Sequence, residues 1–300
     1  MFLLPYFLQG LVEMNVLSLF DGMSCGQLAL RKANVPYSNY YASEINKYAI
    51  AVTQHNFPNT VQVGDVCLLT PEQFPKIDLL MGGSPCQGFS CAGKGLNFED
   101  PRSKLFFEYV RLKNQLQPKY FLLENVKMKK EYQDIISDHL GVQPVLLNSS
   151  LVSAQLRARL YWTNLPIPEI QDKGIMLKDV LETEDYGQYY YLPDEKIFNL
   201  SFPGNRVYYG NKSKWGYLQR NVAWLPEGKH GCLAVSNGGR VYVNGKVRKT
   251  SRKEMERLQT VPDGYTDIVS YNQAMGLLGN GWTVDIIAEF FKSLNLVDED

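Results

Sequence analysis

The chain has 300 residues, of which 45% are hydrophobic and 21% charged, and its 31 basic residues balance its 31 acidic residues. This composition excludes a disordered, collagenous or coiled-coil chain, and the length suits one large domain or two unequal ones. The five cysteines include no CxxC pair, which argues against a disulfide scaffold and favours a cytoplasmic location. No apolar run reaches the roughly 18 residues of a membrane span, and the three scattered histidines form no local zinc motif.

The first 13 residues lack the basic lead and the small-residue cleavage site of a signal peptide. Met14 directly precedes the first convincing strand. We therefore expect residues 1–13 to be an extension or the product of an upstream start.

From residue 15 to about 164, short apolar runs alternate with segments whose apolar residues recur at helical spacing. The apolar runs predict strands at 15–20, 39–43, 77–81, 120–123 and 160–163, and the helical spacing predicts helices at 27–32, 47–55 and 103–116. This alternation predicts an α/β fold with a doubly wound, mostly parallel sheet covered on both faces. Ligands of such folds lie at the carboxyl ends of the strands, so the informative residues should follow the strands.

The pattern changes near residue 165, where two prolines interrupt it. The stretch to about 252 is rich in Gly, Asn, Tyr and Trp, and Asn244-Gly245 is a good hairpin turn. Helical periodicity returns at 252–258 and at 284–294. We expect a larger domain made of residues 14–164 and 253–300, with a smaller β-rich domain at 165–252.

Positive charge is concentrated in one segment of this smaller domain. Residues 205–253 contain eleven Lys or Arg residues, six Tyr or Trp residues and a single acid, Glu227. Basic residues interleaved with aromatic ones are typical of a site for a polyanion such as nucleic acid. The alternative is a solvated surface whose charges have no partner.

Acidic residues follow three successive strands. Phe20-Asp21-Gly22 opens a Gly-containing turn after the first strand, Glu44 follows the second, and Asp65 follows a third apolar run. An acid about 20 residues beyond a glycine turn can accept hydrogen bonds from the ribose of an adenosine cofactor, and Asp65 could accept from an adenine amino group. The alternative is that Glu44 and Asp65 only cap the helices that follow them.

The fourth strand is followed by Gly82-Gly83-Ser84-Pro85-Cys86, which presents a thiol on a stiff turn at the carboxyl end of the sheet. Near a helix N-terminus such a thiol is favoured as the reactive thiolate. The other four cysteines have no such setting, so we expect them to be structural. Residues 88–94 spell G-x-x-x-x-G-K, but Gly95 replaces the magnesium-binding hydroxyl of a phosphate loop, so an NTPase is disfavoured. We expect the loop at 87–103 to close over a substrate.

Three further segments carry polar residues near strand ends. Glu124 directly follows the apolar start of the fifth strand and is a candidate for proton exchange, with a helix cap as the alternative. Gln155, Arg157 and Arg159 alternate along one face, where two guanidinium groups suit an oxyanion. Leu278-Gly279-Asn280-Gly281-Trp282-Thr283 is expected to form a ligand-contacting turn before the last helix.

Together these motifs resemble those of the DNA (cytosine-5) methyltransferases, in the order usual for that family. The resemblance spans 15–164 and 240–300, leans toward the de novo-type branch, and suggests a bacterial or phage single-chain form. The matching motifs are FDGMSCG at 20–26, GSPCQGFS at 83–90, LLENV at 122–126, QLRAR at 155–159 and LLGNGWTVDI at 277–286.

The resemblance implies a methyltransferase fold that binds S-adenosyl-L-methionine, and a small domain that recognises double-stranded DNA. It implies that Cys86 adds to carbon 6 of a flipped-out cytosine, that Glu124 binds ring N3 and the amino group, and that Arg159 contacts O2. Arg157 and Gln155 would support this catalytic site. No metal is implied, and a monomer is possible.

By the same resemblance, Phe20 stacks on adenine, Glu44 holds the ribose and Asp65 the adenine amino group. The other expected cofactor contacts are Asp21, Gly22, Ile45, Val66, Pro85, Leu105 and Asn280. The basic residues expected to contact DNA are Arg206, Arg220, Arg240, Lys246, Arg248 and Lys249.

Two alternatives stay open. A tRNA cytosine-5 methyltransferase would share the fold and the nucleophile, but the Cys-Phe-Thr motif typical of that branch is missing here. A catalytically inactive DNA-binding relative is disfavoured because Cys86, Glu124 and Arg159 are all present. Restriction-modification, phage self-protection and regulation all remain possible biological settings.

Overall fold

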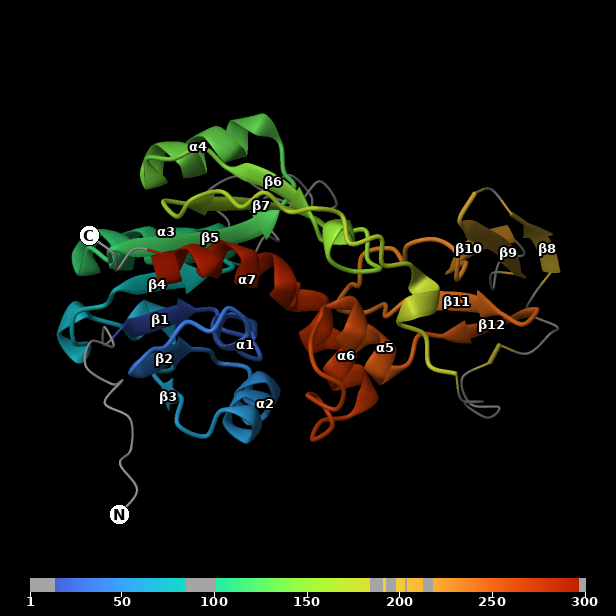
Figure 1. Cartoon of the computed structure of the whole chain (residues 1–300), viewed down its shortest axis with the longest axis horizontal. Helices are drawn as coiled ribbons and strands as arrows, with labels where there is room; N and C mark the ends of the chain where they lie inside the picture. The colour runs from blue at the N-terminus through green and yellow to red at the C-terminus, as the bar shows by residue number, and fades with distance from the viewer. Residues whose placement is uncertain are drawn as a thin grey trace, which may run out of the picture.

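The computed structural model describes residues 14–84, 101–183, 191–192, 198–202, 204–212 and 218–296. These residues form two β-sheets with helices around and between them. Figure 1 shows the smaller sheet at the far end of the molecule from strands β1 to β3, with helices α5 and α6 between the two sheets. Among the residues described, no helix is long and apolar enough to cross a membrane.

The larger sheet has seven strands in the order β3-β2-β1-β4-β5-β7-β6. All neighbours pair in parallel except β7, which is antiparallel to both β5 and β6, so the expected doubly wound, mostly parallel fold is confirmed. The strands are β1 (Asn15–Leu19), β2 (Asn39–Ser43), β3 (Val61–Gln62), β4 (Leu79–Gly82), β5 (Tyr120–Val126), β6 (Val145–Asn148) and β7 (Ala158–Thr163).

Seven α-helices connect and cover these strands in the described ranges. They are α1 (Cys25–Lys32), α2 (Lys47–Asn56), α3 (Pro101–Leu116), α4 (Lys130–Leu140), α5 (Arg252–Leu258), α6 (Tyr271–Asn280) and α7 (Val284–Phe291). The five predicted strands are present as β1, β2, β4, β5 and β7. The third apolar run, which precedes Asp65, forms the two-residue strand β3, whereas sequence patterning missed β6, which has no fully buried residue.

Alternation along the strands divides the core between the two faces of the sheet. In β1, Val16 packs with α1, α2 and α7, whereas Leu17 packs with α3 and α4 on the opposite face. Both side chains are completely buried, as expected for a parallel sheet covered on both sides.

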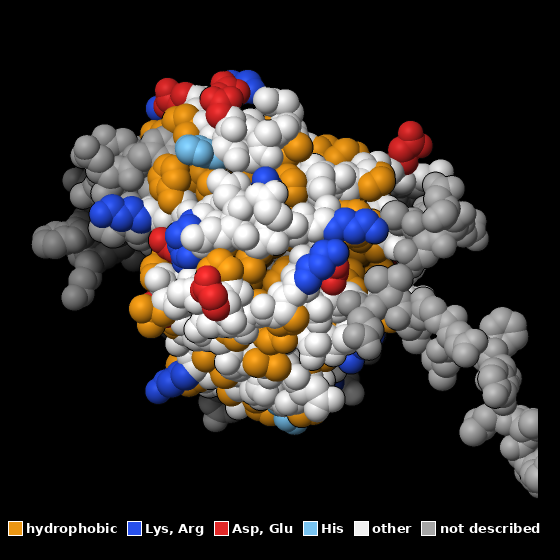
Figure 2. All heavy atoms as spheres, turned by 90° about the vertical axis from the view of Figure 1, so that its left-hand side faces the viewer, with side chains coloured by type: hydrophobic (Ala, Val, Ile, Leu, Met, Phe, Trp, Pro, Cys, Tyr) orange, Lys and Arg blue, Asp and Glu red, His pale blue; other side chains and the backbone are white. Residues whose placement is uncertain are grey.

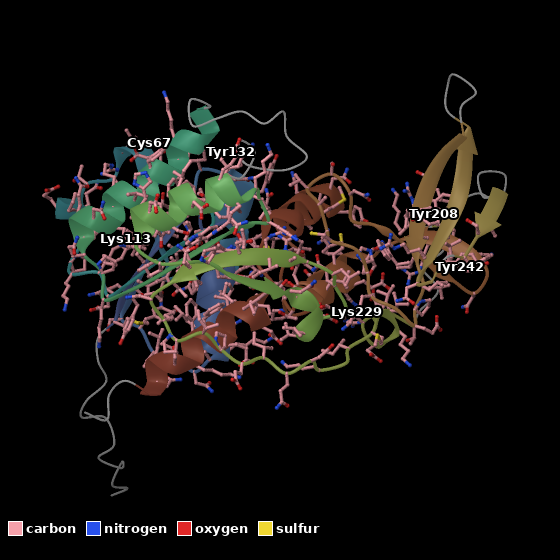
Figure 3. The ribbon with its side chains drawn as sticks, turned by 90° about the horizontal axis from the view of Figure 1, so that it is seen from above. Cys67, Lys113, Tyr132, Tyr208, Lys229 and Tyr242 are labelled. Carbon is pink, nitrogen blue, oxygen red and sulfur yellow. The ribbon has the colours of Figure 1, made fainter. Side chains whose placement is uncertain are left out.

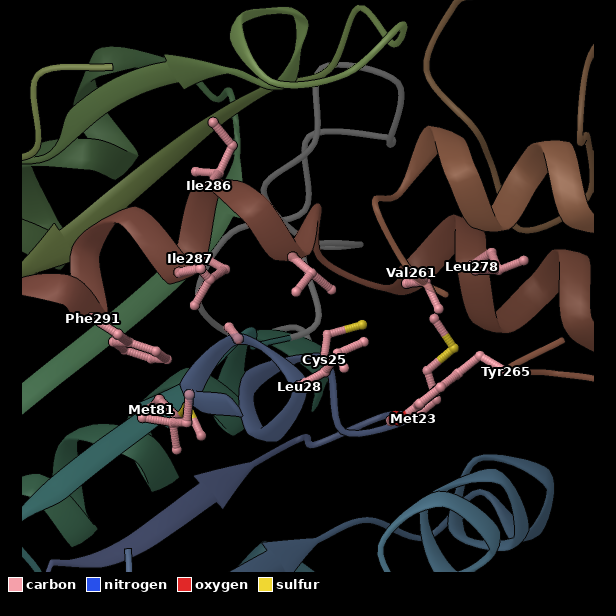
Figure 4. Close-up of a cluster of buried hydrophobic side chains, with 14 of the residues drawn as sticks. Met23, Cys25, Leu28, Met81, Val261, Tyr265, Leu278, Ile286, Ile287 and Phe291 are labelled. Atoms are coloured by element: carbon pink, nitrogen blue, oxygen red, sulfur yellow. The ribbon is translucent and has the colours of Figure 1, made fainter. Parts of the chain in front are cut away.

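Apolar side chains of α6 and α7 belong to the core on the face of the larger sheet that carries Val16. Figure 4 shows Ile287 and Phe291 of α7 above Leu28 of α1 and Met81 of β4, with Leu278 of α6 beside Val261 and Tyr265. Burial of these apolar side chains stabilises the packing of the C-terminal helices against the N-terminal strands. Residues 253–296 therefore share a core with residues 14–164, and this core also includes Leu165, Leu177, Val180, Leu233 and Val241.

The second sheet has five strands in the order β12-β11-β10-β9-β8. Its strands are β8 (Phe198–Ser201), β9 (Arg206–Lys212), β10 (Leu218–Trp224), β11 (Arg240–Val243) and β12 (Lys246–Lys249). The predicted turn at Asn244-Gly245 joins β11 to β12, with φ of 52° and 78° at its two residues. Val207, Tyr209, Ala223 and Val247 form a small separate core beneath this sheet.

An ion pair that the sequence did not suggest ties this sheet to α5. Arg248 faces away from the small core and is buried, and its guanidinium donates to both carboxylate oxygens of Glu254 at 2.6 and 2.8 Å. Glu254 also accepts from Ser251 N–H, the N-cap of α5, and from Glu182 N–H. Arg248 was expected to contact DNA, and the structure contradicts this, because strand alternation turns it inward against α5.

The end of the molecule opposite the second sheet does not share the excess of positive charge found in the segment at 205–253. Figure 2 shows acidic and basic side chains interspersed on this face, with apolar side chains between them. Concentrated positive charge is thus a property of the sequence around β9–β12 rather than of this end of the molecule.

We predict that Arg248→Met lowers the free energy of unfolding by about 3–5 kcal/mol, because it leaves the buried Glu254 carboxylate without its counter-charge. Adding Glu254→Gln should recover most of the loss, since glutamine also completes a capping box. Denaturant unfolding measures both. Lys246→Met, on the exposed part of the same strand, is the control and should change stability by about 0.5 kcal/mol or less. A loss below about 1 kcal/mol for Arg248→Met would contradict a buried pair.

Candidate active site

The loop after β1 is held in an unusual backbone conformation at the carboxyl end of the sheet. Phe20, Gly22 and Ser24 have φ of 57°, 60° and 59°, in the left-handed region. Non-glycine residues there cost roughly 1–2 kcal/mol each, and such strain is concentrated at functional sites. The loop leads directly into α1, and Phe20, Asp21, Gly22 and Met23 of this loop line a cavity.

Glu44 connects this loop to the end of β2. Its Oε2 accepts from Gly22 N–H at 2.8 Å, and its Oε1 accepts from the N–H groups of Ile45 and Asn46, each at 2.8 Å. Asn46, not Glu44, caps α2. The capping alternative is therefore wrong for Glu44, whose carboxylate faces the cavity with fixed orientation.

Asp65 does cap the short helix that follows it, because its Oδ1 accepts from Cys67 N–H at 3.0 Å. It also lines the same cavity and is exposed there, so capping does not prevent it from contacting a ligand. Its function as a cofactor contact stays a prediction.

Asp21 points into the protein. Its Oδ1 accepts from the hydroxyl of Tyr40 at 2.7 Å, and its Oδ2 accepts from the hydroxyl of Ser24. Burial raises the pKa of Asp21 to about 6, although these hydroxyl donors act in the opposite direction. Both carboxylate oxygens are occupied, so the side chain of Asp21 shapes the loop after β1, and the residue also lines the cavity.

Glu124 lies inside β5, near its carboxyl end, with 8% of its surface exposed. Its Oε1 pairs with Nε of Arg159 on the adjacent strand β7 at 2.9 Å, and its Oε2 accepts from the indole N–H of Trp282 at 3.1 Å. The helix-cap alternative is thus wrong for Glu124. A nearly buried carboxylate held by a cation and a neutral donor faces the cavity instead.

The segment leading to Cys86 is anchored beside this carboxylate. The side-chain amide of Asn125 donates to the Ser84 hydroxyl at 3.2 Å. A Cβ on Gly83 would lie 2.9 Å from Nε1 of Trp282 and 3.1 Å from Oε2 of Glu124, so only glycine permits this approach. Cys86, Pro85 and most of the loop expected to close over the substrate lie outside the described residues.

Arg157 and Gln155 form a buried frame behind the cavity. Arg157 donates to the carbonyl oxygens of Leu233, Gly279 and Gly281 at 2.9–3.2 Å. Gln155 donates to the Leu258 carbonyl at 2.9 Å and accepts from Leu233 N–H at 2.9 Å. Of the two arginines, Arg159 therefore pairs with Glu124, while Arg157 joins the loop at 232–239 to the end of α6.

One cavity of about 390 Å³ collects most of the predicted residues. From the predicted cofactor set it is lined by Phe20, Asp21, Gly22, Glu44, Ile45, Asp65, Val66, Leu105 and Asn280. From the predicted catalytic set it is lined by Glu124, Arg157 and Arg159. Gln155 is not among the lining residues.

The sequence predicted that the segment containing Trp282 contacts a ligand, but it did not predict the contact of Trp282 with Glu124. It expected residues 278–283 to form a turn, whereas α6 continues through Asn280 and only Gly281-Trp282-Thr283 links it to α7. The side-chain direction of Trp282 depends on where α6 ends, which periodicity did not reveal.

The described cysteines differ in environment. Cys25 is 4% exposed, and burial raises the pKa of its thiol to about 12, which makes it inert, as expected for a structural cysteine. Cys67 and Cys232 are exposed, so they do not fill the core.

The predicted DNA contacts also differ in exposure. Lys246 and Lys249 are exposed at the two ends of β12, and Arg206 is exposed with its guanidinium 5.0 Å from the Trp224 ring centroid. Arg240 is partly buried, and the side chain of Arg220 lies outside the described residues. Figure 3 shows the aromatic residues Tyr208 and Tyr242 together on this sheet, far from Cys67 and Lys113.

Comparison with known proteins places the chain in a family. Residues 14–163 match the family model of the C-5 cytosine-specific DNA methylases. The chain is 33% identical to the Type II methyltransferase M.HaeII of Haemophilus aegyptius, with 95% of each chain covered. It is 31% identical to M.NgoBI of Neisseria gonorrhoeae, covering 94% of this chain and 93% of that one.

Solved structures agree on the fold. The Entamoeba histolytica methyltransferase EhMeth has a TM-score of 0.73 at 16% identity, and the match covers 96% of this chain and 100% of that one. A putative prophage DNA modification methyltransferase from E. coli has a TM-score of 0.69 at 22% identity, with 96% and 100% covered. With motifs, fold and sequence identity in agreement, the chain belongs to the C-5 cytosine-specific DNA methylases, enzymes that use S-adenosyl-L-methionine as methyl donor.

Proposed function

We propose that this chain methylates carbon 5 of a target cytosine in double-stranded DNA, with Cys86 as nucleophile and Glu124 and Arg159 as the groups that bind the base. The observation that carries this proposal is that one cavity is lined both by the acids that follow β2 and β3 and by the Glu124–Arg159 pair of β5 and β7.

The residues of the cavity fit S-adenosyl-L-methionine. Glu44 would accept hydrogen bonds from the ribose, Asp65 from the adenine amino group, and Phe20 would stack on adenine. The carboxylates also favour a cationic ligand over an anionic one. When bound, this cofactor supplies a methyl group on a positively charged sulfur. Asn280 and Leu105, which line the cavity from α6 and α3, would complete its walls.

Glu124 and Arg159 suit the polar edge of cytosine. Two of the four lone-pair positions of the Glu124 carboxylate are taken by Arg159 and Trp282, which leaves acceptor positions for the amino group of the base. The remaining donors of Arg159 can contact O2. Charge that develops on the ring during the reaction would thus meet preorganised partners.

Cys86 would start the reaction by adding its thiolate to carbon 6, which makes carbon 5 electron-rich enough to take the methyl group. A base then removes the carbon 5 proton, the electrons of that bond form the carbon 5–carbon 6 double bond, and the carbon 6–sulfur bond breaks to release the Cys86 thiolate. The short tether between Gly83, packed against Glu124, and Cys86 supports this assignment. Carbon 6 is inaccessible within a duplex, so the base must be flipped out.

A tRNA substrate is not favoured. The two relatives at 33% and 31% identity, which cover 95% and 94% of this chain, are named type II methyltransferases, and the chain lacks a Cys-Phe-Thr motif. The type II names also suggest a restriction-modification setting, and the bacterial sources of these relatives support a cytoplasmic location in a bacterial host. We also propose that residues 14–164 and 253–300 form the catalytic domain and that residues 165–252 form the recognition domain.

Cys86→Ser should abolish methyl transfer, because a serine hydroxyl is a far weaker nucleophile at neutral pH than a thiolate. Binding of S-adenosyl-L-methionine should persist. Bisulfite sequencing of DNA from expressing cells measures the activity, and calorimetry measures cofactor binding. Cys67→Ser, at an exposed cysteine, is the matched control and should stay active. Methylation by Cys86→Ser would refute the assigned nucleophile.

DNA with 5-fluorocytosine at the target position should form a covalent complex that survives denaturing electrophoresis. Fluorine cannot leave as the proton does, so the carbon 6–sulfur bond stays intact. Once bisulfite sequencing has identified the target site, the same duplex with unmodified cytosine is the control. If no such complex forms with confirmed target DNA and bound cofactor, a covalent mechanism is excluded.

Replacing both Lys246 and Lys249 with Gln should weaken DNA binding and reduce the slope of log K against log salt concentration by roughly 0.9 for each phosphate that is no longer neutralised. Fluorescence anisotropy at several salt concentrations provides the slope. The control is the same double replacement at Lys129 and Lys130, exposed lysines of the larger domain. An unchanged slope would mean that β12 does not face DNA.

A further inference from the structure

The Glu124 carboxylate is held by two donors of different kinds. On one side, Nε of Arg159 comes from the neighbouring strand β7 and carries positive charge. On the other side, the indole N–H of Trp282 comes from the link between α6 and α7, 158 residues away in sequence, and is neutral. Each oxygen of the carboxylate is thus fixed by one donor, so its plane within the cavity is set from both sides.

The indole that provides the second donor is itself tightly placed. A Cβ on Gly83 would come within 2.9 Å of its Nε1, and a Cβ on Gly26 would come within 3.3 Å of its Cζ3. The ring therefore lies between the loop after β4 and the start of α1, where both neighbours lack side chains. Such close packing leaves the N–H little freedom to point elsewhere.

We propose that Trp282 is a positioning residue for the reaction: its N–H orients the Glu124 carboxylate toward the edge of the flipped-out cytosine. This inference rests on the proposed function, in which Glu124 binds the base. Arg159 is expected to turn part of its guanidinium to O2 of the base. When it does so, the Trp282 hydrogen bond remains to keep the carboxylate in place.

A neutral donor suits this task for an electrostatic reason. A second cation beside Glu124 would compete with the base for the remaining carboxylate lone pairs and neutralise the charge that meets the substrate. An indole N–H has a single donor and no acceptor, so it fixes one oxygen and leaves the rest of the group unchanged.

The test compares two tryptophans that each donate one hydrogen bond, the partly buried Trp282 and the buried Trp162. Trp282→Phe removes the N–H that donates to Glu124. Trp162 lies on β7, away from the cavity, and its N–H donates to the Ser137 hydroxyl at 2.9 Å, so Trp162→Phe removes an equivalent hydrogen bond. We expect Trp282→Phe to slow single-turnover methyl transfer roughly 10- to 100-fold, as for loss of a hydrogen bond to a charged group. Dissociation constants for cofactor and DNA should change about threefold or less.

Trp162→Phe should leave the single-turnover rate within about threefold of the unmodified protein. Equal rates for the two variants would overturn the proposal. So would a weakened cofactor affinity with an unchanged single-turnover rate in Trp282→Phe, because the indole would then serve the cofactor cavity. Absence of any 5-methylcytosine with the unmodified protein would instead refute the proposed function.

A double-mutant cycle with Glu124→Ala asks whether Trp282 acts through the carboxylate. In the Glu124→Ala background, Trp282→Phe should reduce the residual single-turnover rate by about twofold or less. An undiminished effect in that background would mean that the indole acts by another route, which would overturn the proposal.

Gly83→Ala provides an independent second variant if Trp282→Phe does not fold. The added methyl group would meet both Nε1 of Trp282 and Oε2 of Glu124 and force them apart. We expect the same combination of a slower single-turnover rate and retained cofactor binding. A Gly83→Ala protein with an unchanged rate would contradict the inference, because the hydrogen bond could then be displaced without consequence.

Discussion

The arrangement of this site depends on holding one carboxylate, that of Glu124, nearly buried near the carboxyl end of β5 in the mostly parallel sheet. Burying a charge in this way is costly unless it is paired and hydrogen-bonded. Arg159 and Trp282 satisfy this requirement from opposite sides. Both donors come from segments distant from β5 in sequence, so the site exists only when β7 and the C-terminal helices are in place. Its geometry is therefore linked to completion of the fold.

The regions of the two sheets are joined by buried polar contacts rather than by apolar packing alone. Arg157 binds carbonyl oxygens on both the loop at 232–239 and the end of α6, and Gln155 connects that loop to α5. Arg248 and Glu254 tie β12 to the start of the same helix. Hydrogen bonds of this kind have strict geometry, so they set the orientation of the second sheet relative to the cavity.

Most of the secondary structure around the site could be predicted because it depends on local pattern. Apolar runs marked β1, β2, β4, β5 and β7, and an acid after each of several strands marked the cavity. Prediction from the sequence was wrong where a side chain's direction depends on a distant partner. The Lys-Val-Arg-Lys segment of β12 looked like a surface strand, but Arg248 meets Glu254 of α5. Likewise, Glu44 and Asp65 looked equivalent, yet only Asp65 caps a helix.

By itself, the sequence determined the class of fold, the family and the set of residues from which the site is built, because short motifs at strand ends carry this information locally. Tertiary structure alone decided which of those residues meet. It separated Arg159, which pairs with Glu124, from Arg157, which binds backbone carbonyls, although the two are only two residues apart. It also brought Trp282 to Glu124. The physical reason is that hydrogen bonding depends on distances of about 3 Å between groups remote in the chain, which only the packed fold establishes.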